Sequence, residues 1–482
     1  MAKFNAAQTV RTVNQSGHAA YGMDAKSKLV SQVLTSFFNE SKFYGDNSDE
    51  LTDTVRTVMQ SDPRFVSKLA LFSRREFHMR SVAHVLTAYL AHEEKGKPFV
   101  RETVRGVSMR GDDVTEIMAF YLSAFGKPVP NSLKKGIGDI LAGLDEYALA
   151  KYKGFGKAVK MRDLLCLCRP TPKDAEQSAL WKRCLENKLE TPLTWETELS
   201  AHGNNAETWE RLIDSGKVGY MALLRNLRNI IEANPSNIEK VYQRIENPDA
   251  VRKSKQLPFR FLSAYKSIAD IAGSRAFDAL ENAVDASVSN MPRLSGTTVI
   301  AVDESGSMDG RVSGKSSVRC VEVGMTLGLI ANQICDNAVF YAFNESIRKV
   351  AVSHRSGILR NALNARADGG TNMYLPFEKA LRDGVNADRL IILSDNECNA
   401  GGGWHKDEPV QAIADEYRRK SGRDIWVHAV DLQGYGTQQF HGARTNVIAG
   451  WSEKVFQFIL LAEQGEGSLI QTIENYAFSS NA

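Results

Sequence analysis

Long hydrophobic runs are missing from this sequence of 482 residues. A helix that crosses a bilayer needs about 20 consecutive apolar residues, and no stretch comes near that length. The first residues, Met1-Ala2-Lys3-Phe4-Asn5, lack the apolar core and the cleavage site of a secretory signal. We therefore expect a soluble, cytoplasmic protein that does not bind a membrane.

Cysteine and histidine are scarce, and neither has the spacing of a metal or catalytic site. The six cysteines form no disulfide framework, which fits a reducing compartment. Cys166 and Cys168 lie close together without a matching second pair, so we expect buried thiols on a helix rather than zinc ligands. The nine histidines show no H-x-x-x-H spacing, and Ser305 and Ser307 have no adjacent histidine base. We therefore predict that the protein is not an enzyme.

Strand-like alternation is scarce between about residues 25 and 290, where apolar residues recur at helical spacing instead. The clearest predicted helices cover residues 66–72, 82–90, 114–125, 133–149, 200–214, 221–232, 238–246 and 259–271. The charged segment at residues 74–76 separates the first two of these. Successive helices without strands predict a bundle or a solenoid, and the length favours a solenoid.

The pattern changes after residue 295, where short apolar strands begin to alternate with helices. Strands are predicted at residues 298–303, 339–343, 390–394, 425–431 and 447–451, with helices at 318–335, 375–381, 409–420 and 453–461. Repeated strand–helix units predict a doubly wound, mostly parallel sheet. A chain of this length exceeds a single domain, so we predict a helical domain at residues 1–295 and an α/β domain at 296–482.

Oxygen-bearing side chains follow two of the predicted strands. The first group is a D-x-S-x-S sequence at residues 303–307, and a second acid, Asp395, ends a later strand. Thr371 sits between them in a glycine-rich loop before a helix. Ligands bind beyond the carboxyl ends of strands in such sheets, and oxygen ligands suit Mg²⁺. These residues therefore predict a divalent-cation site, although D-x-S-x-S can also be a turn with helix-capping serines.

Positive charge is concentrated in the first part of the chain. Residues 1–295 hold 42 Lys and Arg against 35 Asp and Glu, whereas the remainder holds 18 against 22. The densest cationic segment spans residues 151–169, with Tyr152 and Phe155 among its cations. Its candidate RNA-binding residues are Lys151, Lys153, Lys157, Lys160, Arg162 and Arg169. Cations beside aromatic rings suit nucleic acid, but a solvated loop before a helix gives the same pattern.

The second part of the chain resembles the von Willebrand factor A domain, whose metal-ion-dependent adhesion site uses D-x-S-x-S, then Thr, then Asp. The resemblance implies that an acidic group of a partner completes the metal's coordination. The implied metal ligands are Asp303, Ser305, Ser307, Thr371 and Asp395. Family members often place Gly after the last Asp, where this chain has Asn396.

The whole chain resembles the Ro autoantigen, or TROVE-domain, family in its bacterial form. The resemblance rests on the five metal positions and on residues 62–75, 151–153, 163–165 and 257–261. It implies a ring of HEAT-like helical repeats closed by the A domain, and a monomer. It also implies that small noncoding Y RNA binds the basic outer surface, that single-stranded ends of misfolded RNA enter the ring, and that exoribonucleases are partners.

One residue of the family's Y RNA contact is not matched. Relatives have a histidine after the Asp-Leu-Leu segment, where this chain has Cys166-Leu167-Cys168-Arg169. The leading hypothesis is a non-catalytic RNA-binding scaffold in RNA quality control. The alternative is a metal-dependent protein–protein adaptor without RNA binding, and a more remote one is a Mg²⁺-dependent nuclease at Asp303 and Asp395.

Overall fold

The computed structural model describes residues 10–35, 48–152, 158–289, 291–312, 316–352, 357–399, 410–452, 454–465 and 469–478. The chain forms two compact units. One unit comprises residues 1–39 and 202–471, and the other comprises residues 40–201 and 472–482. The predicted domain boundary at residue 295 is based on the sequence pattern, whereas these two units are defined by contacts between residues. The boundary at residue 295 therefore stays a prediction.

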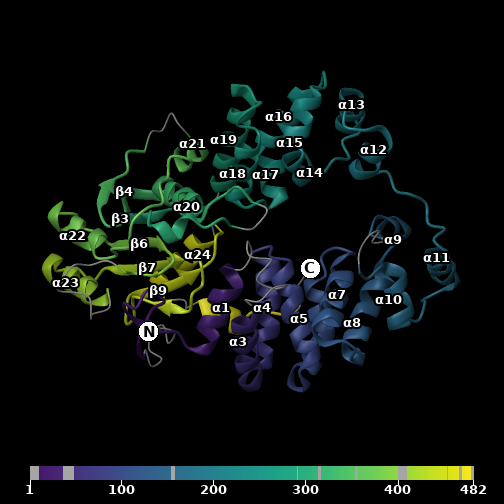
Figure 1. Ribbon diagram of the computed structural model, residues 1–482, viewed down its shortest axis with the longest axis horizontal. Helices are drawn as coiled ribbons and strands as arrows, with labels where there is room; N and C mark the ends of the chain where they lie inside the picture. Colours follow the sequence, from purple (N-terminus) through teal and green to yellow (C-terminus); the bar gives the residue numbers. More distant parts are fainter. Residues whose placement is uncertain are drawn as a thin grey trace. The chain divides into compact units, whose positions relative to one another are not determined.

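The second unit is helical. Its helices are α3 (Ser48–Ser61), α4 (Pro63–Arg75), α5 (Ser81–His92), η3 (Glu94–Gly96), α6 (Lys97–Val107), α7 (Asp113–Phe125), α8 (Asn131–Gly143), α9 (Glu146–Lys151), α10 (Met161–Cys168) and α11 (Ala175–Leu185), followed by α12 (Trp195–His202), which ends at the junction with the first unit. Asp62 starts α4 by accepting a hydrogen bond from the Phe65 amide at 3.0 Å. Helices α3, α4 and α5 lie side by side (Figure 1).

Several helix boundaries differ from the prediction: those at residues 200–214 and 221–232 are each divided into two helices, and two further differences have a visible cause. Arg74 and Arg75 lie inside α4 rather than between helices, because Arg74 is buried and donates to Asp113 at 3.1 Å. The predicted helix at 133–149 is divided between α8 and α9, since Asp145 caps a new helix by accepting from the Ala148 amide at 2.7 Å.

The first unit contains the remaining helices before the sheet. These are α13 (Ala206–Asp214), α14 (Tyr220–Arg225), α15 (Leu227–Ala233), α16 (Ile238–Glu246), α17 (Pro248–Ser254), α18 (Pro258–Ser267) and α19 (Ser274–Val288). They contact the α/β part directly. Lys266 of α18 donates to both carboxylate oxygens of Glu322 at 2.8 Å, and Glu281 of α19 accepts from the amides of Leu359 and Arg360 at 2.9 Å.

A six-stranded sheet begins at β3, as the change in sequence pattern predicts. Its strands are β3 (Leu294–Asp303), β4 (Cys335–Phe343), β5 (Ile347–Lys349), β6 (Arg389–Ser394), β7 (Trp426–Asp431) and β9 (Thr445–Ala449). Their order is β5-β4-β3-β6-β7-β9, and every pairing is parallel except β4 with β5 (Figure 1). The prediction of a doubly wound, mostly parallel sheet is confirmed.

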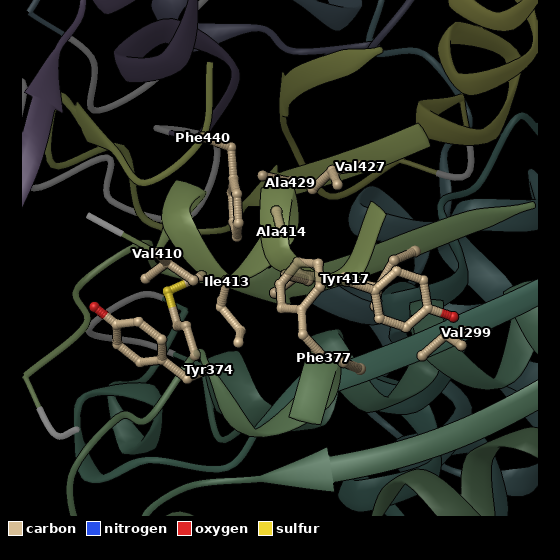
Figure 2. Close-up of a cluster of buried hydrophobic side chains, with 14 of the residues drawn as sticks. Val299, Tyr374, Phe377, Val410, Ile413, Ala414, Tyr417, Val427, Ala429 and Phe440 are labelled. Carbon is tan, nitrogen blue, oxygen red and sulfur yellow. The ribbon is translucent and has the colours of Figure 1, made fainter. Parts of the chain in front are cut away.

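Helices that alternate with the strands or follow the last strand pack with the sheet. They are α20 (Cys320–Ile334), α21 (Ile358–Ala362), α22 (Leu375–Arg382), α23 (Gln411–Ser421) and α24 (Val455–Gln464), and α25 (Leu469–Glu474) follows them. Figure 2 shows Phe377 of α22 and Tyr417 of α23, whose rings meet edge to face at 6.3 Å, beside Val299 and Val427 of the sheet. This buried aromatic layer fixes both helices on one face.

The amino-terminal segment adds a small sheet that the sequence did not reveal. Strands β1 (Arg11–Val13) and β2 (Ala19–Gly22) form a hairpin, and β2 pairs with β8 (Thr437–Gln438) of the α/β part. Helix α1 (Ala25–Thr35) follows, and Ser31 donates to Asp431 at 2.6 Å. Within residues 11–35, β2 and α1 therefore pack with the carboxyl-terminal part of the chain.

Candidate metal site and nucleic-acid surface

The two predicted acidic ligands lie at one edge of the main sheet. Asp303 ends β3, and Asp395 follows β6, the neighbouring parallel strand, in which Leu393 is paired with Val302. The chain runs from β3 to β4 on one side and later to β6 on the other. The acids therefore occupy the point where the strand order reverses, which is the usual ligand position of a doubly wound sheet.

Both serines lie in the turn that follows Asp303. The Ser305 amide donates to Asp303 Oδ1 at 2.8 Å, which closes the turn. The hydroxyls of Ser305 and Ser307 are 3.1 Å apart. Ser305 is buried, whereas Ser307 is exposed at the start of the short helix η4 (Gly306–Asp309). The turn therefore presents a pair of hydroxyls between the acids and solvent.

Backbone hydrogen bonds bring the Thr371 loop to this turn. The Gly306 amide donates to the carbonyl of Gly369 at 2.9 Å. The Thr371 amide donates to Asn399 Oδ1 at 2.7 Å, and the Asn399 amide donates to the carbonyl of Thr371 at 3.0 Å. The loop is thus tied both to the D-x-S-x-S turn and to the segment after Asp395. The fold brings all five predicted residues to one end of the sheet.

Two oxygen atoms at this end are buried without a hydrogen-bond partner among the described residues, Thr371 Oγ1 and Asp395 Oδ2. Both residues are 1% exposed. A buried polar atom that lacks a partner costs about 1–3 kcal/mol, and more when it is charged. Such atoms call for a ligand, and a divalent cation would satisfy both.

The charge of the site also favours a cation. Burial raises the pKa of Asp303, and the nearby charge of Asp395 raises it further. Burial likewise raises the pKa of Asp395. Ser394 donates to Asp303 Oδ2 at 2.6 Å, which offsets only part of this cost. A bound divalent cation would reverse the shifts, since it stabilises the ionised form of both acids.

The five residues fit a hard cation. Two carboxylates and three hydroxyls supply only oxygen, the ligand type that Mg²⁺ prefers. No group of three or more His, Cys, Asp or Glu side chains arranged for metal binding occurs in the described part of the chain.

Other acids near this edge are already paired. Glu304 accepts a bidentate pair of hydrogen bonds from Arg348, with the shorter at 2.7 Å. Glu397 accepts from Thr437 Oγ1 at 3.1 Å and from the Ser16 amide at 3.2 Å. The amino-terminal hairpin therefore borders the site, which no sequence pattern indicated.

Asn396 stands where the A-domain family often has glycine. The backbone conformation of Asn396 explains why glycine is common at this position. Its φ is 61°, in the left-handed region that glycine and asparagine tolerate best. The side chain is 1% exposed, and neither its Oδ1 nor its Nδ2 atom has a partner within the described ranges. The departure from glycine thus keeps the turn and adds a buried amide next to Asp395.

The basic segment is an exposed surface at the end of α9 and around α10. Lys151 ends α9, with its ammonium 5.5 Å from the Tyr147 ring centre and 5.6 Å from that of Tyr152. Lys160 precedes α10, and Arg169 ends it in a left-handed conformation. All three are exposed, and none forms a salt bridge within the described parts of the chain.

The remaining basic residues contribute less to this surface. Arg162 is exposed, but its Nε lies 3.8 Å from the carboxylate of Asp163. Lys153 and Lys157 lie outside the described residues. Lys151, Lys160 and Arg169 are therefore the residues whose exposure supports the predicted surface.

The prediction of buried thiols on a helix is correct only for the helix. Both cysteines lie on α10, but Cys166 is exposed and Cys168 is half-buried. The reason is the short length of α10, whose apolar face is formed by Met161, Leu164 and Leu165. Burial raises the pKa of Cys168 to about 12, so this thiol stays protonated.

Comparison with known proteins gives matches over both parts of the chain. The family model described as the TROVE domain matches residues 22–187 and 181–275, and the Ro60 vWA domain model matches residues 297–441. No helix in the described portions is long and apolar enough to cross a membrane.

Two curated relatives illustrate different coverage. The RNA-binding protein RO60 of Deinococcus radiodurans is 23% identical over 477 residues, which cover 85% of this chain and 87% of that protein. Telomerase protein component 1 of Rattus norvegicus is 26% identical over 338 residues, which cover 51% of this chain and 13% of that protein. This chain thus corresponds to a small part of the telomerase component.

A solved structure has the same fold. The crystal structure of the Deinococcus radiodurans RO (RSR) protein aligns with a TM-score of 0.60 and 19% sequence identity, over 86% of this chain and 94% of the other. The prediction of a helical amino-terminal region with a carboxyl-terminal A domain is confirmed. Because the TROVE domain model matches more than half of the sequence, the chain belongs to the Ro autoantigen, or TROVE-domain, family.

Proposed function

We propose that this protein is a non-catalytic scaffold that binds RNA through its basic segment and recruits a protein partner through a Mg²⁺ site in its A domain. The RNA is a small noncoding Y or Y-like RNA, and single-stranded ends of misfolded RNA are a second ligand. The protein would act in the cytoplasm, as a monomer, together with an exoribonuclease in RNA quality control.

The observation that carries the RNA part is the exposure of Lys151, Lys160 and Arg169 without salt bridges in the described chain. Cations that no carboxylate neutralises can bind phosphates and release counterions, which is the main source of affinity for nucleic acids. Tyr147 and Tyr152 beside Lys151 add rings that could stack on bases. The curated relatives named RNA-binding protein RO60 support the same ligand class.

Charge reversal tests this assignment. Replacing Lys151 and Lys160 with glutamate should lower the affinity for a structured RNA hairpin about 100-fold, since two phosphate contacts are lost and two repulsions are added. The matched control reverses Lys240, which is exposed but pairs with Asp214 at 2.8 Å. Fluorescence anisotropy with a labelled hairpin measures both. Equal affinities for the double variant and the control would contradict the assignment.

The RNA itself is best identified by crosslinking the protein in cells and sequencing the attached transcripts. A structured small RNA with crosslinks near residues 151–169 supports the proposal. Purified protein that carries no RNA, with an absorbance ratio typical of protein alone, favours the adaptor instead.

The adaptor is a second candidate because one observation favours it independently. Thr371 Oγ1 and Asp395 Oδ2 are buried at the same end of the sheet without a partner among the described residues. Asp303, Ser305, Ser307, Thr371 and Asp395 would hold Mg²⁺, and the ion would supply a coordination position for a carboxylate of a partner protein. Binding of an acidic partner that requires Mg²⁺ but not RNA would support this function.

A further inference from the structure

Three cations lie on one face of α4 in the helical unit. Arg64, Lys68 and Arg75 are separated by four and seven residues, so they recur after about one and two helical turns. At about 1.5 Å of rise per residue, the row spans about 16 Å along the helix. Among the described residues, none of the three forms a salt bridge with a carboxylate. The row therefore carries positive charge that the unit does not neutralise by ion pairing.

The carboxyl-terminal tail, defined here as residues 472–478, lies over this row within the same unit. Lys68 Nζ donates to the carbonyl of Glu474, and Arg75 Nη2 donates to the carbonyl of Phe478 at 3.1 Å. The Phe478 ring lies 5.6 Å from the Arg64 guanidinium and 5.8 Å from the Lys68 ammonium. The tail thus gives these cations two carbonyl oxygens and one aromatic ring, and the Glu474 charge acts on Lys68 from nearby.

These tail groups resemble the parts of a nucleotide. The carbonyl oxygens stand where phosphate oxygens would accept hydrogen bonds, and the Phe478 ring stands where a base would stack. Phe99, whose ring is parallel to that of Phe478 at 6.4 Å, would remain as a stacking surface after the tail leaves. A phosphate would bind the row more strongly than a carbonyl, because hydrogen bonds between ions are roughly twice as strong as neutral ones.

Aromatic and hydrogen-bond contacts of Tyr476 help to anchor the tail. Tyr476 donates to Glu76 at 2.8 Å and meets the Phe72 ring edge to face at 5.4 Å. Asn475 and Ala477 are exposed, and Phe478 is only half-buried. Burial lowers the pKa of Lys68 and the charge of Arg64 lowers it further, while the charges of Asp62 and Glu474 partly offset both effects. A polyanion that binds the row of cations would displace these contacts.

We propose that Arg64, Lys68 and Arg75 form a binding surface for the phosphates of single-stranded RNA, and that the carboxyl-terminal tail occupies this surface until RNA displaces it. The proposal rests on the proposed RNA-binding function. It adds a second RNA-binding surface whose accessibility is set by the carboxyl-terminal tail. A tail that covers the row nine-tenths of the time lowers the apparent affinity about tenfold.

The test compares the full chain with a variant that lacks residues 472–482, using a labelled oligouridine and a labelled RNA hairpin. Deletion should raise the affinity for oligouridine about tenfold and leave hairpin binding unchanged. Phe478→Ala, which keeps the Tyr476 contacts, should raise the affinity for oligouridine by a smaller factor. In the deletion variant, Lys68→Gln should reduce the salt slope of oligouridine binding by about 0.7. Lys95→Gln is the matched control, since Lys95 is exposed and donates to a carbonyl, that of Gln60.

The outcomes separate this inference from the proposed function. If the hairpin binds but neither tail variant increases oligouridine affinity, the tail does not cover an RNA surface and the inference is wrong. Weaker oligouridine binding after deletion is equally contrary, because the tail would then be part of the site. If neither RNA binds any of the proteins, the RNA-binding function itself fails. Thermal melting confirms that each variant is folded.

Discussion

The two units each bury an acidic centre, and the two centres are opposite in character. In the helical unit, Asp113 is fully buried and accepts hydrogen bonds from four groups. Its donors are Arg74 Nη2 at 3.1 Å, Arg80 Nε at 2.5 Å, and the amides of Met109 and Arg110 at 2.9 Å, and His84 Nε2 lies 3.2 Å from its Oδ1 atom. In the A domain, the negative charge of Asp395 acts unfavourably on Asp303. Asp395 Oδ2 has no hydrogen-bond partner among the described residues.

The difference appears in the pKa values and distinguishes a structural acid from a binding acid. Burial alone would raise the pKa of Asp113, but the neighbouring His84 and the charges of Arg80 and Arg74 hold it well below its usual range. The pKa values of Asp303 and Asp395 are raised instead, because burial outweighs the hydrogen bonds that these acids accept. A buried acid whose charge is balanced by neighbouring cations holds helices together. A buried pair of acids whose ionised forms are not balanced in this way is suited to bind an external cation.

The largest expected effect is the loss of the Asp113 centre. Asp113→Ala should lower the free energy of unfolding by about 3–5 kcal/mol, because it leaves the buried Arg74 without its carboxylate. Urea denaturation followed by circular dichroism measures the change. A loss below about 1 kcal/mol would show that the centre contributes no more than a surface ion pair.

The second prediction concerns Mg²⁺ and the A domain. At a concentration 100 times its dissociation constant, Mg²⁺ should stabilise the protein by about 2.7 kcal/mol. Asp303→Ala should abolish this stabilisation, while Asp415→Asn, at an exposed residue of α23, should keep it. Thermal melting at several Mg²⁺ concentrations is the measurement. Equal stabilisation of the wild type and Asp303→Ala would place the ion elsewhere.

The two centres should also respond to pH with opposite signs. Asp113 has a folded pKa below its unfolded value of about 3.9, so its stabilisation is present above that pH and is lost as the pH falls through the folded pKa. Asp303 and Asp395 have raised folded pKa values. Without metal they should therefore make the protein less stable as the pH rises from about 3.9 through the folded pKa.

Since Mg²⁺ binds the ionised acids, its stabilising effect should grow across the same pH window. Melting curves with and without Mg²⁺ over a pH series test this sign. Stabilisation by Mg²⁺ that is independent of pH from 4 to 8 would argue that Asp303 and Asp395 do not bind the ion.

The smallest effect is expected at an acid that is paired but not deeply buried. Asp139 accepts hydrogen bonds from Arg101 at 2.7 and 2.9 Å and from Arg105 at 2.8 Å, yet both arginines are exposed. Asp139→Ala should cost only about 0.2–1 kcal/mol. The same denaturation experiment measures it, and a loss as large as that of Asp113→Ala would mean that burial does not set the scale of these effects.

The sequence predicted the A domain and its candidate site better than the rest of the molecule. Asp303, Ser305, Ser307, Thr371 and Asp395 were placed by a motif at strand ends, and the parallel pairing of β3 with β6 brings them to one edge. The metal itself stays a prediction. Long apolar strands and a local motif are strong signals because each is contained within a few adjacent residues.

Other features gave no such signal. The ligands of Asp113 are spread over residues 74 to 113, and only tertiary packing shows that they meet. Strand β8 has two residues, too few for an alternating pattern, so its pairing with the amino-terminal hairpin could not be predicted. Of the three α4 cations, only Arg75 lies in the charged segment that the sequence indicated, and the contacts of Lys68 and Arg75 with the tail depend on residues about 400 positions away.

The most direct test of the RNA-binding account is the affinity for a structured RNA hairpin measured against salt concentration. Phosphate contacts through the basic segment predict a linear fall of the logarithm of the binding constant with the logarithm of the salt concentration, with a slope of about −0.9 per contact. The slope should decrease in magnitude by about two when Lys151 and Lys160 are both replaced by glutamine. A binding constant that does not change with salt would contradict the account.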